Sequence, residues 1–117
     1  MAVTSTRTQT INFTGDVTGT EHISAASNAS SPGSVELKTL DSGANTITLP
    51  TGGSTVTGCT IVPPSGNSTS ITLKGVTGDT GIRLHNTDPS TLTFHSSVTS
   101  FVLTAGGSIT GVRFFWT

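Results

Sequence analysis

Apolar and polar residues alternate in short runs along most of this chain, and Gly, Pro and Asn separate one run from the next. Alternation with a period of two is typical of a β-strand that buries one face, and the separating residues are those that form turns. The turn residues recur at intervals of roughly 8 to 12 residues, as in sandwiches and small barrels. The pattern predicts an all-β fold, a single-domain antiparallel β-sandwich that is jelly-roll-like and has about 8–10 short strands.

The segments that carry this alternation define the expected strands. They are residues 8–13, 17–23, 35–38, 45–49, 55–62, 71–74, 81–85, 91–94, 101–104 and 109–116. The small polar residues of 25–33 predict a loop. Since roughly 120 residues suffice to bury one core without a metal or a disulfide, residues 1–117 are expected to form one domain, with 1–7 as an extended N-terminal arm.

Two of these strands carry details that can be tested. Val35 and Leu37 alternate with charged neighbours, which predicts a half-buried strand with Glu36 and Lys38 on its outer face. In residues 55–62 the apolar positions change parity, and a glycine at 58 is where a β-bulge would restore the facing. Cys59 follows this glycine, and a lone cysteine in such a strand is expected to be a small buried apolar residue.

The last strand has large apolar residues on both faces. Val112, Phe114 and Trp116 share one face, and Arg113 and Phe115 share the other. Either the strand is central and covered on both sides, or one face meets another subunit, because a monomer seldom exposes a large apolar patch. The first three residues are expected to fill the core. Phe115 and Arg113 are the predicted interface residues.

Composition narrows the function classes. The chain has 25 Thr, 16 Ser and 14 Gly, only 9 % charged residues and a net charge of −1. Its five Lys and Arg are scattered, so no clustered cations indicate nucleic-acid binding. No segment approaches the roughly 20 apolar residues of a membrane span, which predicts no membrane contact. A single cysteine cannot form an internal disulfide.

Candidate chemistry was sought among the carboxylates, histidines and hydroxyls. Asp79-Thr80-Gly81 matches the triplet of aspartic proteases, but Thr77 and Gly78 precede it where that family has an apolar strand, so a turn in which Asp79 bonds its own backbone is favoured. If residues 81–95 form a hairpin, one polar face would hold Arg83, His85, Thr91, Thr93 and His95. A third metal ligand is not evident there. No catalytic residue, metal site or cofactor is therefore predicted, and the protein is not expected to be an enzyme.

A resemblance covers about the last half of the chain. The stretches ITLKGVTGDTGIRLH (71–85) and SFVLTAGGSITGVRFFW (100–116) resemble small virion structural proteins, of the decoration or tail kind, of tailed bacteriophages. The resemblance implies a β-sandwich or jelly-roll module that is made in the host cytoplasm and assembles in many copies in the virion. The expected partners are further copies of the chain and other virion proteins.

Two functions remain open at this point. A capsid decoration or cement protein would add contacts between shell subunits by burying apolar surface. A tail-tip or fibre-associated module would instead bind a host cell-surface glycan. An apolar flat face near Phe115 would favour the first function, and aromatic and carboxylate side chains clustered on one rim would favour the second.

Overall fold

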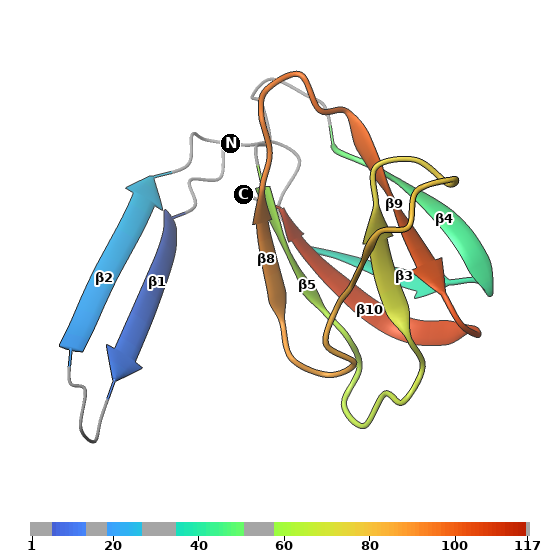
Figure 1. Ribbon diagram of the computed structural model, residues 1–117, viewed down its shortest axis with the longest axis horizontal. Coiled ribbons are helices and arrows are strands. Elements are labelled where there is room, and N and C mark those ends of the chain that lie inside the picture. The colour runs from blue at the N-terminus through green and yellow to red at the C-terminus, as the bar shows by residue number, and fades with distance from the viewer. Residues whose placement is uncertain (1–5, 14–18, 27–34, 51–57, 117) are drawn as a thin grey trace.

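The computed structural model describes residues 6–13, 19–26, 35–50 and 58–116, with side chains described from residue 35 onward, and all its regular elements are strands. Figure 1 labels most of them along the chain. Their bounds are β1 Thr6–Phe13, β2 Gly19–Ala26, β3 Val35–Leu40, β4 Gly43–Thr48, β5 Gly58–Val62, β6 Ile71–Lys74, β7 Ile82–Arg83, β8 Ser90–Thr93, β9 Ser100–Ala105 and β10 Ile109–Trp116.

Eight of these strands form two antiparallel sheets that pack face to face. One sheet has the order β3-β10-β5-β8, and the other has the order β4-β9-β6-β7. This alternation of strands between two four-stranded sheets is that of a jelly roll made of two Greek keys. The predicted single-domain β-sandwich is confirmed. β1 and β2 form a separate two-stranded sheet.

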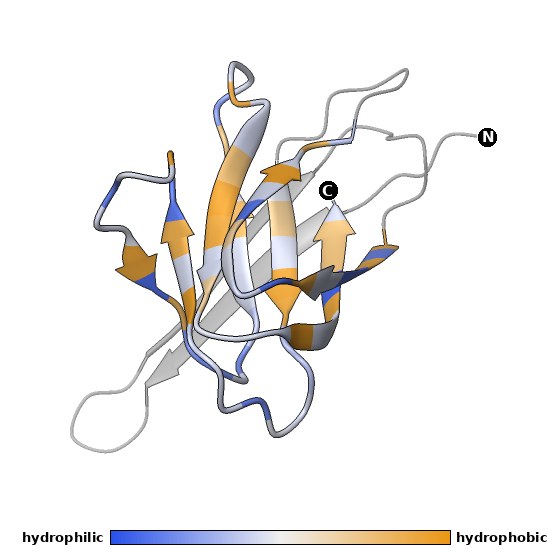
Figure 2. Cartoon of the chain, turned by 90° about the vertical axis from the view of Figure 1, so that its right-hand side faces the viewer, coloured by the Kyte–Doolittle hydropathy of each residue, from blue (hydrophilic) through white to orange (hydrophobic). Residues whose placement is uncertain are grey.

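The core lies between the two sheets, on the inward-facing positions of the alternation. Figure 2 shows hydrophobic residues recurring along the strands of both sheets. Trp116 joins the layers, since its ring lies 5.8 Å from that of Phe114 on the same strand and 6.5 Å from that of Phe101 on β9. The fully buried side chains are Leu40, Ile47, Cys59, Ile61, Ile71, Leu103, Val112, Phe114 and Trp116. The expected burial of Val112, Phe114, Trp116 and Cys59 is confirmed.

A β-bulge interrupts β10. The register with β3 shifts between Ile109 and Val112, and Gly111 has a φ of 86°. That conformation favours glycine, and it lets both Ile109 and Val112 point into the core although their numbers differ in parity. Gly58 instead pairs in regular register with Thr93, so no bulge occurs within the described β5. Val56, on which that expectation depended, lies outside the described residues.

Strand β3 faces the opposite way from the prediction. Glu36 pairs with Phe114 and Lys38 with Val112, so both charged side chains are on the inner side of the sheet. Val35 and Leu37 are on the outer side and are exposed. The reason is the buried Leu40, which shares its parity with Glu36 and Lys38 and fixes the facing of the whole strand.

The predicted hairpin over residues 81–95 is also wrong. β7 pairs with β6, whereas β8 pairs with β5, so the two strands belong to different sheets. At the N-terminal end, Thr6 and Arg7 already belong to β1, while residues 1–5 of the expected arm lie outside the described residues. β2 runs to Ala26, past the start of the predicted loop, because Ala25 and Ala26 pair with Arg7 and Thr6.

Candidate functional site: an apolar sheet face and an open cleft

The two predicted interface residues lie on the outer face of the β3-β10-β5-β8 sheet. Arg113 is exposed and Phe115 is half-buried. The Arg113 guanidinium carbon lies 5.8 Å from the centre of the Phe115 ring, within the range of a cation–π contact. β10 is an interior strand of its sheet, between β3 and β5. Its inner face is core, and its outer face is turned away from the core.

Apolar side chains flank this pair on both neighbouring strands. In β3, Val35 lies opposite Phe115 and Leu37 lies opposite Arg113, and in β5 Val62 lies opposite Arg113. Val35 is 58 % exposed and Leu37 is 70 % exposed, while Val62 is half-buried. Directly paired residues of antiparallel strands share one face. We call Val35, Leu37, Val62, Arg113 and Phe115 the apolar face.

Sequence reasoning found two of these five residues and missed the other three. Val35 and Leu37 were expected to point inward because Glu36 and Lys38 were expected to point to solvent. The signal that could have corrected this is Leu40, since a strand ending on a buried leucine places Glu36 and Lys38 on the core side.

The inward charges are held by specific partners. Lys38 Nζ lies 2.6 Å from Glu36 Oε1, and the Trp116 indole N–H donates to Glu36 Oε2 over 3.3 Å. Both charged side chains stay partly exposed at the margin of the sheet. Glu36 thus accepts the hydrogen bond of the Trp116 indole and is paired with Lys38, while β3 presents Val35 and Leu37 outward.

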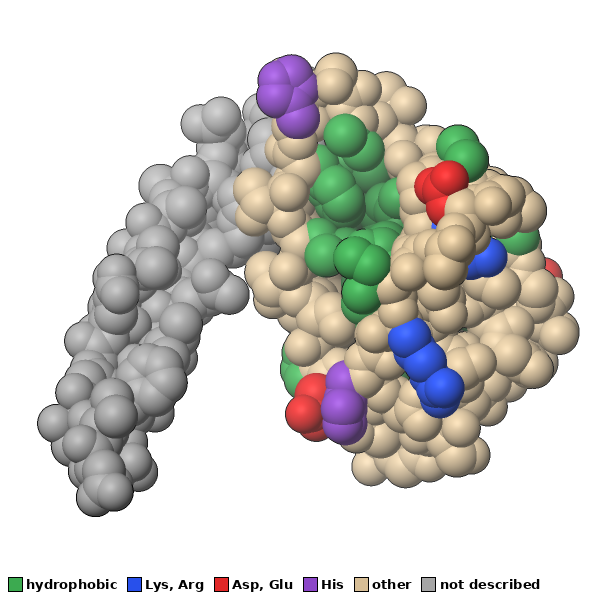
Figure 3. Space-filling view, in the orientation of Figure 1, with side chains coloured by type: hydrophobic (Ala, Val, Ile, Leu, Met, Phe, Trp, Pro, Cys, Tyr) green, Lys and Arg blue, Asp and Glu red, His purple; other side chains and the backbone are tan. Residues whose placement is uncertain are grey.

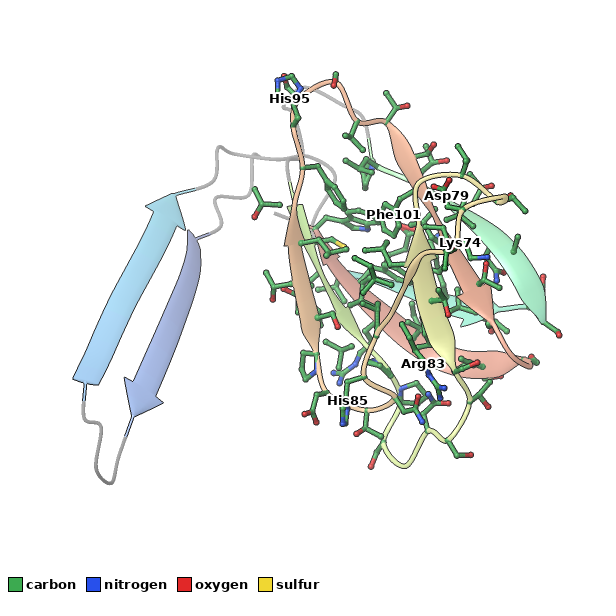
Figure 4. All side chains as sticks on the ribbon, in the orientation of Figure 1. Lys74, Asp79, Arg83, His85, His95 and Phe101 are labelled. Carbon is green, nitrogen blue, oxygen red and sulfur yellow. The ribbon has the colours of Figure 1, made fainter. Side chains whose placement is uncertain are left out.

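A cleft of about 580 Å³ opens on the side of the sandwich where β6, β7 and the β8–β9 connection meet. Figure 3 shows hydrophobic side chains gathered in a hollow of the surface. Phe94 and Phe101 stack at 5.2 Å in this cleft, and Lys74 and Asp79 belong to its lining. Figure 4 shows Lys74 and Asp79 close to Phe101. The remaining apolar lining comes from Leu73, Ile82 and Val98.

Asp79 is engaged by its own turn. Its Oδ2 accepts hydrogen bonds from the backbone N–H groups of Gly75 at 3.1 Å and Val76 at 3.0 Å. These bonds are those of a carboxylate that closes a turn. The predicted turn over this segment is confirmed, and the Asp79 carboxylate already has two donors on one of its oxygens.

The two described histidines likewise bond within their own loops. His85 Nδ1 accepts from the backbone N–H groups of Thr87 and Asp88, and His95 Nδ1 accepts from that of Ser97. Figure 4 shows His85 and His95 at opposite ends of the sandwich. The predicted polar patch is therefore not formed, because the strands meant to join these histidines lie in different sheets.

Arg83 and His85 line a separate hollow of about 730 Å³ together with Asn67 and Asn86. Within residues 35–50 and 58–116, no three His, Cys, Asp or Glu side chains come close enough to hold a metal ion. The part of the chain that the structure describes also has no helix of the length and apolarity needed to cross a membrane.

Comparison with known proteins gives no relative on which to rest an assignment. No family model, no curated protein and no solved structure matches the chain. The chain is therefore classified by its jelly-roll topology alone. Any function must be argued from the apolar face and the cleft.

Proposed function

We propose that this protein is a non-enzymatic bacteriophage virion structural protein, a capsid decoration or cement protein that assembles in many copies. The observation that carries the proposal is the apolar face, where Val35 and Leu37 are exposed beside Phe115 on one sheet. Contiguous exposed apolar surface rimmed by polar residues marks a site of protein–protein contact. Here the polar rim is supplied by Thr60 and Thr91, whose hydroxyls lie 3.1 Å apart farther along the same sheet.

The fold and the resemblance support the same proposal. Jelly rolls serve as viral capsid domains and as lectin domains, so the topology suits both functions left open by the sequence. Residues 71–85 and 100–116 resemble phage virion proteins, and the second stretch includes Arg113 and Phe115. Since one fold hosts many functions, the argument depends on the apolar face and not on the topology.

The physical action of such a protein is to bury this face against a neighbour. Burying a Leu, Val or Phe side chain stabilises a contact by roughly 1.5 to 3 kcal/mol. Arg113 is suited to the same interface, because it combines a long apolar stem with a charged group held over the Phe115 ring. Repeated over many copies, even a modest contact would strengthen a shell.

The direct test is the copy number in purified virions whose genome encodes the chain, measured by quantitative mass spectrometry. A shell protein is expected in hundreds of copies. A handful of copies would indicate a tail component, and complete absence from the virion would overturn the proposal.

A second test asks whether the apolar face is the attachment surface. The Leu37→Ser protein should bind to virions stripped of the native protein at least about tenfold more weakly than the wild type. Val76→Ser is the matched control, because Val76 is similarly exposed (62 %) but lies in the loop between β6 and β7. Equal binding by both variants would show that the apolar face is not used.

The cleft favours a second candidate function, a tail-tip or fibre-associated module that binds a host cell-surface glycan. It combines the Phe94–Phe101 stack with Lys74 and Asp79 in its lining. Sugars pack their apolar faces on aromatic rings and hydrogen-bond to polar groups at the rim. Binding to a glycan array that is lost in Phe94→Ser and kept in Leu37→Ser would favour this function over the first.

A further inference from the structure

The β1–β2 hairpin has no strand partner within the described chain. The two strands pair over their full lengths, from Thr6 with Ala26 to Phe13 with Gly19. They form a sheet of their own, while β3 to β10 already complete the jelly roll. A two-stranded hairpin is at best marginally stable in water unless it packs against another layer. The hairpin therefore needs a surface on which to pack.

The register of the hairpin places its three large apolar residues on one face. Ile11 pairs with Glu21, Phe13 with Gly19 and Gln9 with Ile23, so these positions belong to one face of the two-stranded sheet. The alternate positions form the other face, and apart from Ala26 they are all polar: Thr6, Thr8, Thr10, Asn12, Thr20, His22 and Ser24. The backbone pairing thus gives the hairpin one mixed face, on which Ile11, Phe13 and Ile23 lie beside Arg7, Gln9 and Glu21, and one face that is almost wholly polar.

The apolar face of the sandwich is the complementary surface. Val35 and Leu37 are mostly exposed, so they can be covered by a second molecule. A strand of this length spans roughly 26 Å, enough to cross β3, β10 and β5, which lie roughly 5 Å apart. The same hairpin face carries Glu21 and Arg7, and of these Glu21 can pair with Arg113 of the apolar face.

We propose that the β1–β2 hairpin of one copy packs on the apolar face of a second copy. This inference rests on the proposed function, in that it names the partner that the apolar face binds during assembly. The connection from Ala26 to Val35 can span at most about 30 Å when extended, which lets the hairpin reach a neighbouring molecule. Each copy then donates one hairpin and accepts one, so two copies can exchange hairpins in a closed dimer or several can pass them head-to-tail around a ring.

The test uses two full-length variants, one for each side of the contact. Phe13→Ser changes the donor hairpin, and Leu37→Ser changes the acceptor face. Sedimentation velocity over a range of concentrations should show that the wild type self-associates. Each variant should raise the dissociation constant at least about tenfold. Asn12→Ser, on the polar face of the hairpin, and Val76→Ser, outside the apolar face, are the matched controls and should assemble as the wild type does.

Mixing the two variants provides the decisive measurement. The Leu37→Ser protein keeps an intact hairpin and the Phe13→Ser protein keeps an intact apolar face, so an equimolar mixture should form a one-to-one heterodimer and nothing larger. A symmetric contact between two apolar faces would not be rescued by mixing. Thermal transitions of both variants, recorded in the same buffer, show whether each one is folded.

The outcomes that overturn this inference differ from those that overturn the proposed function. A wild type that stays monomeric at every concentration, or a Phe13→Ser protein that assembles like the wild type, excludes hairpin exchange between copies. Two folded variants that fail to complement each other also exclude it. If the hairpin binds a different virion protein, Phe13→Ser will weaken attachment to virions while the isolated chain is monomeric. In each case the copy number in the virion still decides the proposed function separately.

Discussion

The two sheets share one core but present different outer faces. On the β4-β9-β6-β7 sheet the outer positions include four threonines, which we call the threonine face, and the buried Val102 lies among them; the threonines are Thr46 and Thr48 on β4, Thr104 on β9 and Thr72 on β6. On the β3-β10-β5-β8 sheet the outer positions of the first three strands include Val35, Leu37, Val62 and Phe115, beside Arg113 and Thr60. Threonine has the β-branched shape that suits a strand and also a hydroxyl that suits water. The exposed Thr46 and Thr48 thus show how this chain builds a solvated strand surface, and the apolar face departs from that solution.

The largest expected effect comes from the core that both sheets share. Trp116→Ser should lower the free energy of unfolding by about 3–5 kcal/mol, because Trp116 is 1 % exposed and contacts aromatic rings from both sheets. Phe115→Ser, on the opposite face of the same strand, should lower it by about 1 kcal/mol or less. Urea denaturation of the two variants measures the difference. Equal losses would mean that Phe115 also belongs to a packed core.

A second core prediction concerns the Cys59 thiol. Burial raises its pKa from the ordinary 9.0 to about 12. Because the folded-state pKa is above the unfolded one, the stabilising effect of keeping the thiol neutral is complete below pH 9 and is lost as the pH rises toward 12. The melting temperature of the wild type should therefore fall more steeply over pH 9–12 than that of Cys59→Ala.

Labelling gives an independent measurement of the same thiol. Cys59 is 0 % exposed, so a thiol reagent at pH 8 should react with the folded protein far more slowly than with the protein in urea. Rapid labelling of the folded state would show that β5 opens locally and would place it outside the rigid core.

The threonine face contains one residue that does not benefit from its hydroxyl. Thr104 Oγ1 is buried and has no hydrogen-bond partner. Thr104→Val keeps the shape and removes the unsatisfied polar atom, which should raise the free energy of unfolding by about 1 kcal/mol. Thr46→Val, at an exposed position on the neighbouring strand, is the control and should change it by less than about 0.5 kcal/mol. A loss of stability in Thr104→Val would indicate that the hydroxyl bonds to a water molecule.

The smallest effect on stability is expected from placing a threonine on the apolar face and a leucine on the outer face of the other sheet. Leu37→Thr and Thr46→Leu both alter exposed positions, so each should change the free energy of unfolding by less than about 0.5 kcal/mol. Their effects on hydrophobic-interaction chromatography should be opposite, with earlier elution for Leu37→Thr and later elution for Thr46→Leu. Similar retention for both would remove the distinction between the faces.

The sequence was sufficient for the fold because the alternation of apolar and polar residues specifies which segments are strands. It placed Val112, Phe114 and Trp116 correctly. These three large apolar residues occupy alternate positions, so they share one face, and that face must point into the core. It failed for β3, where two apolar and two charged residues alternate and the facing depends on Leu40. It also failed for β7 and β8, because neighbours in the sequence can pair with distant strands, and nothing local encodes that choice.

The candidate site was predicted in part for the same reasons. Phe115 and Arg113 could be recognised because a strand with large apolar residues on both faces is unusual. Val35 and Leu37 could not, since their exposure follows from the facing of β3. The cleft could not be predicted either, because Leu73, Phe94 and Phe101 come together only when the two sheets pack.

The inward pair of charges on β3 has a consequence for what the sheet edge can do. β3 is an outer strand of its sheet, so one side of its backbone offers unpaired N–H and C=O groups to any passing strand. A second chain that extended the sheet at this edge would have to pass close to the charges of Glu36 and Lys38, which lie beside the indole of Trp116. Inward-pointing charge on an edge strand is one of the devices by which natural proteins discourage uncontrolled strand addition. The same two residues that allow β3 to expose its apolar side chains therefore also place charge near the edge at which another strand could add.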